Sequence, residues 1–351
     1  MPLTVLNVAF PLSPVGNARA GGAEQILMHL DAGLTSRGHR SLVIAQEGSR
    51  VCGTLVPVPR PPEALSHQAF VRAEQAHREA IASVLARERV DVVHLHGVDF
   101  FCYLPRTCLA PVVVTLHLPR ACYQPEARDL RFPGVRFVCV SRSQLRSWPN
   151  RQLDVVDNGV PLDRFGAAIS RRQYVLLLGR ICPEKGWHLA LDAARRAGIR
   201  AVLAGSVQGF PEHERYFHEE IRPWLQRGRA VYIGAAEGTR KRRLLGAARC
   251  VVISSQVPET SSLAAIEALA SGTPVVAFAR GALPDLVEHG HNGFLVDNVD
   301  EMADAIQHVG RLDPEACRQT AVARFDANRM VDAYLALYAR ETASRAAASV
   351  A

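Results

Sequence analysis

Short apolar runs alternate with amphipathic segments along most of the chain, and this alternation predicts an α/β fold. Residues 3–10 are apolar and rich in β-branched and aliphatic side chains, as expected for a buried strand. Residues 23–36 carry apolar side chains at helical spacing, Gly38 ends that segment, and residues 40–45 resume a strand. This β-loop-α-β unit is the repeating element of a doubly wound parallel sheet.

The same alternation continues to the end of the chain. Residues 51–67 are rich in proline and are expected to form a loop. We expect further strands at residues 90–96, 112–117, 136–140, 153–156, 174–178, 199–204, 230–233, 250–253, 275–278 and 294–296. We expect further helices at residues 68–89, 141–147, 187–197, 212–227 and 238–247, one from about residue 299, and one at 328–345.

Length and the restart of the pattern both indicate two domains. A chain of 351 residues exceeds the size at which one hydrophobic core stops growing. The turn Asp157-Asn158-Gly159-Val160 comes just before a linker at residues 165–173, after which the strand-helix alternation begins again. We therefore expect domains at residues 1–165 and 166–325, followed by a last helix at 326–345.

Composition and net charge limit the classes of molecule that the protein is expected to bind. The formal charge of +7 and the pI near 9.2 favour acidic small molecules, an anionic membrane surface or nucleic acid. Only 6% of the residues are aromatic, and the basic run Arg240–Arg243 is more typical of a solvated helix face than of a nucleic-acid site. We expect no nucleic acid as the main partner.

Cysteine spacing and hydropathy indicate a cytoplasmic protein without a metal. The eight cysteines include no Cys-x-x-Cys pair and no histidine at zinc-site spacing, so free thiols are expected. No apolar run has the length of a membrane span. Residues 1–12 lack a basic leader and are expected to be a strand instead of a signal peptide.

The stretch 250–276 holds the most distinctive candidate chemistry. It is typical of a strand, a polar turn with hydroxyl residues and an Ala-rich helix that ends at Gly272. Backbone N–H groups at such a helix start suit phosphate oxygens. Glu259 in the turn and Glu267 about two helical turns further lie eight positions apart, and this spacing is roughly 10 Å, about the length of a sugar joined to a diphosphate. Two acids alone are more often a cap residue and a surface charge.

Other candidate residues fall where strands end. Arg180 and Lys185 lie in a loop between a strand and a helix, where they would neutralise a diphosphate. His96 and His117 end two neighbouring strands, so they would project beyond the sheet; a hydrogen-bonded structural histidine is the alternative. Gly21 and Gly22 stand at the first strand-to-helix turn, where backbone approaches a ligand.

Taken in order, these pieces resemble the family-4 retaining glycosyltransferases of the GT-B fold, two Rossmann-like domains facing a cleft. The resemblance covers residues 3 to about 339. It rests on Gly21-Gly22-Ala23-Glu24, the paired strand-end histidines, Val156-Asp157-Asn158-Gly159-Val160, Gly179-Arg180 with Lys185-Gly186, Glu259 with Glu267, Gly272-Thr273-Pro274-Val275, and Asn292-Gly293-Phe294-Leu295-Val296.

The resemblance implies a role for each matching residue. The first domain would bind the acceptor, the second the nucleotide sugar, and the last helix would cross back to the first domain. Arg180 and Lys185 would bind the donor diphosphate, Glu267 the ribose hydroxyls and Glu259 the transferred sugar. His117 would be a catalytic residue beside that sugar. The remaining members of the implied site are Gly21, Gly22, Thr260, Ser261 and Ser262 at the donor, with His96 and Ser141 lining the cleft.

The implied reaction moves a sugar from a nucleotide-diphosphate sugar to an acceptor hydroxyl with retained configuration. No Asp-x-Asp pair is present, so no metal or other cofactor is expected. The family usually has an aromatic residue and a glycine soon after the first motif Glu, whereas Thr260-Ser261-Ser262 follows here, which leaves the donor sugar open. Asp285 stands where the family often has Glu and is given no role.

The acceptor could be a glycan, a lipid or a small molecule. The basic charge is compatible with an acceptor at the inner face of a membrane and equally with a soluble one. A GT-B relative that epimerises or hydrolyses nucleotide sugars, and a non-catalytic nucleotide-sugar-binding protein, are the alternatives. A dinucleotide oxidoreductase is disfavoured because the glycine turn lacks Gly-x-Gly-x-x-Gly.

Overall fold

The computed structural model describes residues 2–16, 21–61, 66–105, 107–148, 153–166 and 174–350. Contacts divide the chain into two compact units, one of residues 1–159 with 327–351 and one of residues 160–326. The division falls inside the turn Asp157-Asn158-Gly159-Val160 and returns at Ala327. In the second unit the two ends meet, because Val160 N–H donates to Phe325 O over 2.8 Å.

The first unit is built on a seven-stranded sheet with parallel pairings between its described strands. Its order is β3 (Thr54–Val58), β2 (Arg40–Gln46), β1 (Thr4–Val8), β4 (Val92–Leu95), β5 (Val112–Leu116), β6 (Val135–Cys139) and β7 (Asp154–Val155). The strand order reverses between β1 and β4, which makes their carboxyl ends the topological switch point of this sheet. The predicted α/β class is confirmed here.

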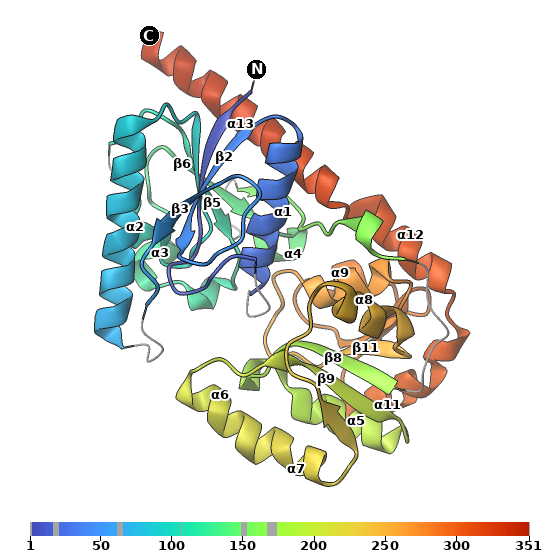
Figure 1. Ribbon diagram of the computed structural model, residues 1–351. Helices are drawn as coiled ribbons and strands as arrows, with labels where there is room; N and C mark the ends of the chain where they lie inside the picture. The colour runs from blue at the N-terminus through green and yellow to red at the C-terminus, as the bar shows by residue number, and fades with distance from the viewer. Residues whose placement is uncertain are drawn as a thin grey trace. The chain divides into compact units, whose positions relative to one another are not determined.

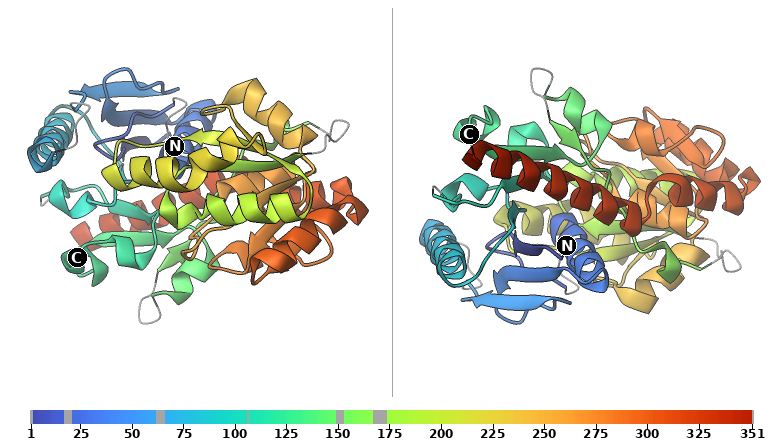
Figure 2. Two further views of the ribbon diagram at one scale, coloured as in Figure 1. Left: turned by 90° about the horizontal axis from the view of Figure 1, so that it is seen from below. Right: turned by 90° about the horizontal axis from the view of Figure 1, so that it is seen from above.

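Helices cover this sheet, as Figure 1 shows. The main ones are α1 (Gly22–Ser36), α2 (His67–Arg87), α4 (Arg142–Arg146) and α13 (Ala327–Val350). The short segments are η1 (Phe100–Cys102), η2 (Arg120–Cys122), α3 (Pro125–Arg128) and, at the start of the second unit, η3 (Leu162–Arg164). α13 runs beside α1, as the right view of Figure 2 shows, and a Cβ at Gly33 would come 2.4 Å from a methyl group of Val331.

The second unit has a six-stranded sheet, again with parallel pairings. Its order is β10 (Ala230–Tyr232), β9 (Arg200–Ser206), β8 (Tyr174–Arg180), β11 (Cys250–Ile253), β12 (Val275–Phe278) and β13 (Gly293–Val296). Here the order reverses between β8 and β11. The carboxyl ends of these two strands are therefore the place where this fold binds ligands.

The predicted helices of the second unit are present in the predicted order, together with several that the pattern did not predict. They are η4 (Pro183–Lys185), α5 (Trp187–Arg196), α6 (Pro211–Tyr216), η5 (Phe217–Ile221), α7 (Arg222–Gln226), α8 (Gly238–Ala247), α9 (Leu263–Ala270), α10 (Leu283–Leu286), α11 (Val299–His308), η6 (Val309–Arg311) and α12 (Pro314–Arg324). The pattern did not predict α12. It begins at Pro314, where the Asp313 carboxylate accepts from the N–H of Glu315 over 2.9 Å, a start signal with few apolar residues behind it.

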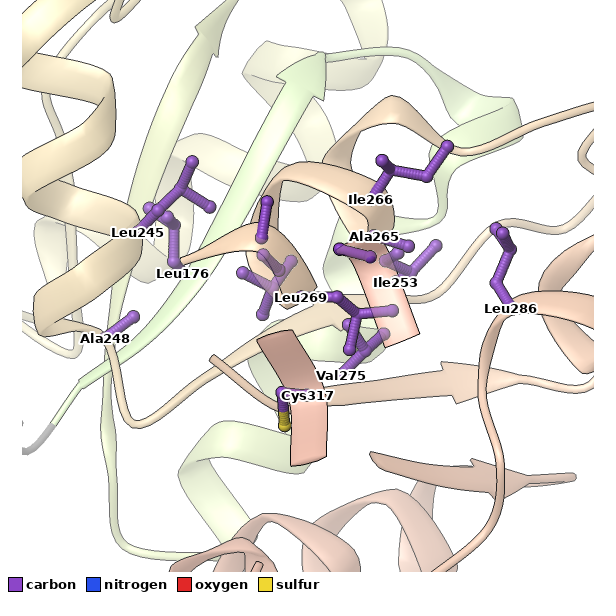
Figure 3. Close-up of a cluster of buried hydrophobic side chains, with 14 of the residues drawn as sticks. Leu176, Leu245, Ala248, Ile253, Ala265, Ile266, Leu269, Val275, Leu286 and Cys317 are labelled. Carbon is purple, nitrogen blue, oxygen red and sulfur yellow. The ribbon is translucent and has the colours of Figure 1, made fainter. Parts of the chain in front are cut away.

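A buried apolar cluster joins α9 to the sheet of the second unit. Leu269 and Ile266 of α9 pack with Ile253 of β11 and Val275 of β12, and Cys317 of α12 closes the same cluster (Figure 3). These side chains are at most 7% exposed. Burying that face fixes the direction of α9, and hence the place where its first turn meets the end of β11.

Two predictions of local structure were wrong. Residues 51–67 were expected to be a loop, but Thr54–Val58 forms β3 at the edge of the first sheet, where the missing N–H of Pro57 is tolerated. Arg180 was expected in a loop, but it is the last residue of β8, paired with Ser206 of β9. β8 continues through Gly179, whose φ of 136° suits glycine.

Candidate functional site

The carboxyl ends of β8 and β11 bring together two predicted site residues, Lys185 and Glu259. The Lys185 ammonium donates to Glu259 Oε1 over 2.6 Å, and the Ser255 hydroxyl donates to the same oxygen. The side chains of Lys185 and Glu259 are 29% and 9% exposed, so the ion pair is partly shielded from water. Both residues follow the strands that flank the switch point of the second unit.

Backbone contacts hold the two loops that carry this pair. The Ser254 hydroxyl donates to the carbonyls of Lys185 and Gly186, over 3.0 and 2.8 Å. The N–H of Gln256 donates to Glu184 O over 2.7 Å. Gly186 has a φ of 59°, and a Cβ there would lie 2.4 Å from the Ser254 carbonyl oxygen, so only glycine fits. The two loops are thus fixed to each other by hydrogen bonds and by close packing.

The loop from β11 to α9 is also anchored on its far side. Glu259 forms a parallel bridge with Gly281, and the N–H of Ala282 donates to Glu259 O over 2.8 Å. The Arg280 guanidinium donates to Ser255 O over 3.3 Å. A Cβ at Gly281, where φ is 62°, would lie 2.3 Å from Glu259 O. The backbone position of Glu259 therefore depends on a glycine that sequence reasoning did not single out.

Glu267 lies elsewhere on α9 and has its own cation. α9 begins at Leu263, with the Ser262 hydroxyl accepting from the N–H of Ala265, so Glu267 sits in the second turn and not two turns beyond the polar loop. Its side chain is 5% exposed, and Lys241 of α8 donates to Glu267 Oε1 over 2.6 Å. Thr260 and Ser261, half-buried, lie in the loop between the two acids.

The pairing of Lys241 corrects an interpretation of the sequence. Residues 240–243 were expected to be a solvated face, but the Lys241 side chain is 18% exposed and forms a partly buried ion pair with Glu267. The sequence shows that a basic residue on the helix before β11 could pair with an acid on α9. It does not show which of the four neighbouring basic residues points toward α9.

Arg180 lies near the same loops. It is half-buried at the end of β8, and its charge acts on the Glu184 and His213 side chains. Burial lowers the pKa of His213 below its usual value. Arg180 ends β8, and Lys185 ends η4, the short helix that follows. Two cations therefore lie at or just beyond the carboxyl end of this strand.

The first unit places the two predicted histidines together. His96 Nδ1 and His117 Nε2 are 3.1 Å apart and share a hydrogen bond at the ends of β4 and β5. Burial lowers the pKa of His117 to about 3 and that of His96 well below its usual value, so both rings are neutral at pH 7. His96 Nε2 is buried and has no hydrogen-bond partner among the described residues.

A third histidine, which the sequence did not single out, connects this pair to α13. His94 Nδ1 lies 2.6 Å from the Tyr338 hydroxyl and His94 Nε2 lies 2.7 Å from the Thr115 hydroxyl. The rings of His94 and His96 are 4.0 Å apart. The Tyr334 hydroxyl also bonds Thr115, over 2.9 Å. α13 is therefore attached to the strand ends by a buried polar network.

Three other predicted residues have structural contacts. Gly21 is the N-cap of α1, and a Cβ there would lie 2.6 Å from the Glu24 carboxylate; Gly22 is the first residue of α1. The Ser141 hydroxyl accepts from the N–H of Gln144 and caps α4. Residues 17–20, which precede Gly21 in the sequence, lie outside the described residues.

Comparison with known protein families accounts for both units. The model of the Glycosyltransferase Family 4 matches residues 20–164, and that of Glycosyl transferases group 1 matches residues 161–323. The chain belongs to the group 1 glycosyltransferases. Together the two matches contain all the predicted site residues. The first match holds Gly21, Gly22, His96, His117 and Ser141, and the second holds the others.

Relatives of this group 1 glycosyltransferase include the D-inositol 3-phosphate glycosyltransferases of Mycobacterium bovis and Mycobacterium tuberculosis. They are 33% identical to it over 216 residues, which cover 54% of this chain and 44% of the relative. The match thus spans less than half the length of these curated relatives.

Solved structures share the whole fold. AviGT4, a glycosyltransferase involved in avilamycin A biosynthesis, is 25% identical with a TM-score of 0.74, covering 98% of this chain and 99% of that one. Anabaena HepE in complex with UDP-glucose is 18% identical with a TM-score of 0.71, covering 97% and 100%. The predicted GT-B fold is confirmed.

Proposed function

We propose that this protein transfers a sugar from a nucleotide-diphosphate sugar to an acceptor hydroxyl, with retention of configuration and without a catalytic metal. The observation that carries the proposal is the Lys185–Glu259 pair at the switch point of the second unit, with Arg180 at the end of β8. A parallel sheet of this kind binds its ligand at that edge. The solved complex of HepE with UDP-glucose, which has the same fold, supports the class of donor.

The ion pair leaves room for the proposed contacts. A lysine ammonium has three donors, so Lys185 can hold Glu259 with one N–H and a phosphate oxygen with another. The Glu259 carboxylate accepts from Lys185 and Ser255 at Oε1. Oε2 has no hydrogen-bond partner among the described residues and can accept from hydroxyls of the transferred sugar. In the proposal, the pair orients the sugar and the diphosphate together.

Glu267 would bind the ribose through the oxygen that Lys241 does not use. Lys241 donates to Oε1, so Oε2 can accept from ribose hydroxyls. The Lys241 ammonium offsets the negative charge of Glu267, and a carboxylate is a strong hydrogen-bond acceptor. Thr260, Ser261 and Ser262 would line the donor site between the two acids.

In the proposed reaction the bond between the anomeric carbon and the diphosphate oxygen breaks, and its electron pair stays on the phosphate. The acceptor oxygen forms the new bond on the same face of the sugar, and its proton passes to the departing phosphate. Arg180 and Lys185 would stabilise the growing charge of the leaving group, which is the largest contribution expected from such a site. Neutral His117 would donate or accept a hydrogen bond at the sugar.

The acceptor class stays open in this proposal: a glycan, a lipid or a small molecule, met in the cytoplasm or at the inner face of the membrane. Among the described residues, no helix has the length and apolar character needed to cross a membrane.

The test is a donor and acceptor screen with product analysis. Purified protein is incubated with nucleotide sugars and a panel of acceptors in the presence of a chelator, and products are separated and their anomeric configuration determined. A new glycoside with the donor's configuration supports the proposal. Inverted configuration, or only free or epimerised sugar from a panel that includes inositol phosphates, glycans and lipids, would refute it.

Variants connect the activity to the site. Lys185→Ala is expected to lower kcat by about 100-fold or more, the cost of removing one donor to a developing negative charge. Arg222→Ala, at the exposed first residue of α7, is the matched control and should keep normal turnover.

A further inference from the structure

Three side chains with metal-binding chemistry lie together beside η4. They are the Cys182 thiol, the Glu184 carboxylate and the His213 imidazole, and their ligand atoms all lie within 4.8 Å of one another. Cys182 and Glu184 belong to the loop after β8, and His213 belongs to α6. No other described group of three or more His, Cys, Asp or Glu side chains meets this spacing.

The histidine of this cluster has an unfilled bonding position. His213 is 5% exposed, and its Nδ1 is buried without a hydrogen-bond partner among the described residues. The ring of Phe210 stands edge to face with the imidazole, 5.1 Å away, and restricts its orientation. Buried polar atoms in folded proteins nearly always have a hydrogen-bond partner or a ligand, so this imidazole is available to a metal ion.

The set of donor atoms selects the class of cation. One thiol sulfur, one imidazole nitrogen and one carboxylate oxygen suit a borderline-soft divalent ion such as Zn²⁺, whereas Mg²⁺ and Ca²⁺ prefer oxygen ligands alone. We propose that Cys182, Glu184 and His213 bind one Zn²⁺ ion, with a fourth position open to water.

The geometry needs only a small adjustment to close the site. Ligand atoms of a tetrahedral zinc site lie about 3.3–3.8 Å apart, as follows from its bond lengths. The three groups must therefore approach by about 1 Å, which side-chain rotation of the exposed Glu184 can supply. Arg180 is close enough to act on Glu184 and His213 and opposes a cation. Burial raises the pKa of the Cys182 thiol to about 11, so the thiol must release its proton as Zn²⁺ binds. The resulting thiolate and the Glu184 carboxylate together outweigh the single charge of Arg180.

Sequence reasoning missed this site and expected no metal. Cys182 and His213 are far apart in the sequence, and neither belongs to a spaced pair of ligands. The ion would tie α6 to the loop that carries Lys185. The inference does not depend on the proposed transfer reaction, because metal binding can be measured without turnover.

The test uses the full chain after treatment with a chelator and removal of the chelator. Titration with Zn²⁺ is followed by calorimetry, and titration with Co²⁺ by absorption spectroscopy. One Zn²⁺ per chain, and a thiolate-to-cobalt charge-transfer band, are expected. Absence of binding at micromolar Zn²⁺, or binding without a thiolate band, would overturn the proposal.

Substitutions assign the ligands. Cys182→Ser should abolish the thiolate band, and His213→Gln should weaken Zn²⁺ binding by at least about tenfold, since even outer contacts of a metal site cost that much. Glu184→Gln changes an exposed side chain and should keep the fold while weakening Zn²⁺ binding. Cys317→Ser and His218→Gln, both in the same unit, are controls that should bind normally. If Glu184→Gln and Cys182→Ser both bind Zn²⁺ as tightly as the unaltered chain, the assignment of the ligands is refuted.

Discussion

The Lys185 ammonium lies 2.6 Å from the Glu259 carboxylate, although the two residues belong to different loops of the second unit. The loops follow β8 and β11, the strands at which the order of the sheet reverses. A shared hydrogen-bond system through Ser254 and Ser255 fixes them. A cation and an acid are thus held side by side at the carboxyl ends of the central strands, where such a sheet binds its ligand.

The glycine under Glu259 gives a first prediction. Gly281→Ala should lower stability and weaken donor binding, because its Cβ would meet the Glu259 backbone at 2.3 Å in a residue with φ of 62°. Gly290→Ala is the control: its φ of 79° carries the same backbone strain, but no atom lies within 4 Å of the added Cβ. The control should lose about 1–2 kcal/mol from strain alone.

Thermal melts and donor titrations of these two variants separate clash from strain. Gly281→Ala should melt lower than Gly290→Ala, and only Gly281→Ala should bind donor more weakly. Equal melting temperatures and equal affinities would show that the close approach of Gly281 to Glu259 is unimportant.

The partly buried pair of Lys241 and Glu267 gives a second prediction. Lys241→Met should destabilise the chain by about 3–5 kcal/mol, because it leaves the buried Glu267 carboxylate without its cation. The double variant Lys241→Met with Glu267→Gln should recover most of that loss, since neither charge is then left alone. Denaturant unfolding of the single and double variants measures the coupling, and additive losses would contradict it.

The histidines of the first unit predict a loss of stability in acid. Burial lowers the pKa of His77 to about 4 and of His117 to about 3, and those of His94 and His96 well below the usual value. A depressed pKa means that the unfolded chain binds more protons, so stability is full above pH 6.5 and falls as the pH drops toward the folded pKa values. Burial also raises the pKa of Asp99 to about 7, which works in the opposite direction between pH 7 and 4.

Four histidines outweigh one carboxyl, so the melting temperature should be lower at pH 5 than at pH 7. His77 has a buried Nε2 without a partner among the described residues, and His77→Gln should reduce the difference between the two melts. A chain that melts equally at both pH values, or a His77→Gln variant with an unchanged difference, would contradict this interpretation.

The sequence predicted the fold well because strand-helix alternation is a local signal. The runs at 174–178 and 250–253 identified the strands β8 and β11, and parallel-sheet topology then placed Lys185 and Glu259 at one edge. β3 was missed because its five residues include Pro57 and lie in a proline-rich segment. A short edge strand has too few apolar positions to show periodicity.

Contacts between distant segments could not be predicted. Nothing in residues 240–243 shows that Lys241 alone turns toward Glu267, because that choice depends on how α8 and α9 pack. The contacts of His94 could not be predicted either, because in the sequence it is one residue among the apolar residues of a strand. Tyr338 reaches it from the other end of the chain.

A nucleotide titration tests the proposed donor site most directly. The unaltered chain, Lys185→Ala, Glu267→Ala and the control Arg222→Ala are titrated with nucleoside diphosphates and their sugars, and binding is followed by thermal shift and calorimetry. We predict that at least one nucleotide sugar stabilises the unaltered chain and the control. Lys185→Ala and Glu267→Ala should each bind it at least about tenfold more weakly, which corresponds to a loss of about 1.4 kcal/mol. Equal affinity in all four proteins, or no binding of any nucleoside diphosphate or its sugar, would contradict the claim that the switch point of the second unit is a nucleotide-sugar site.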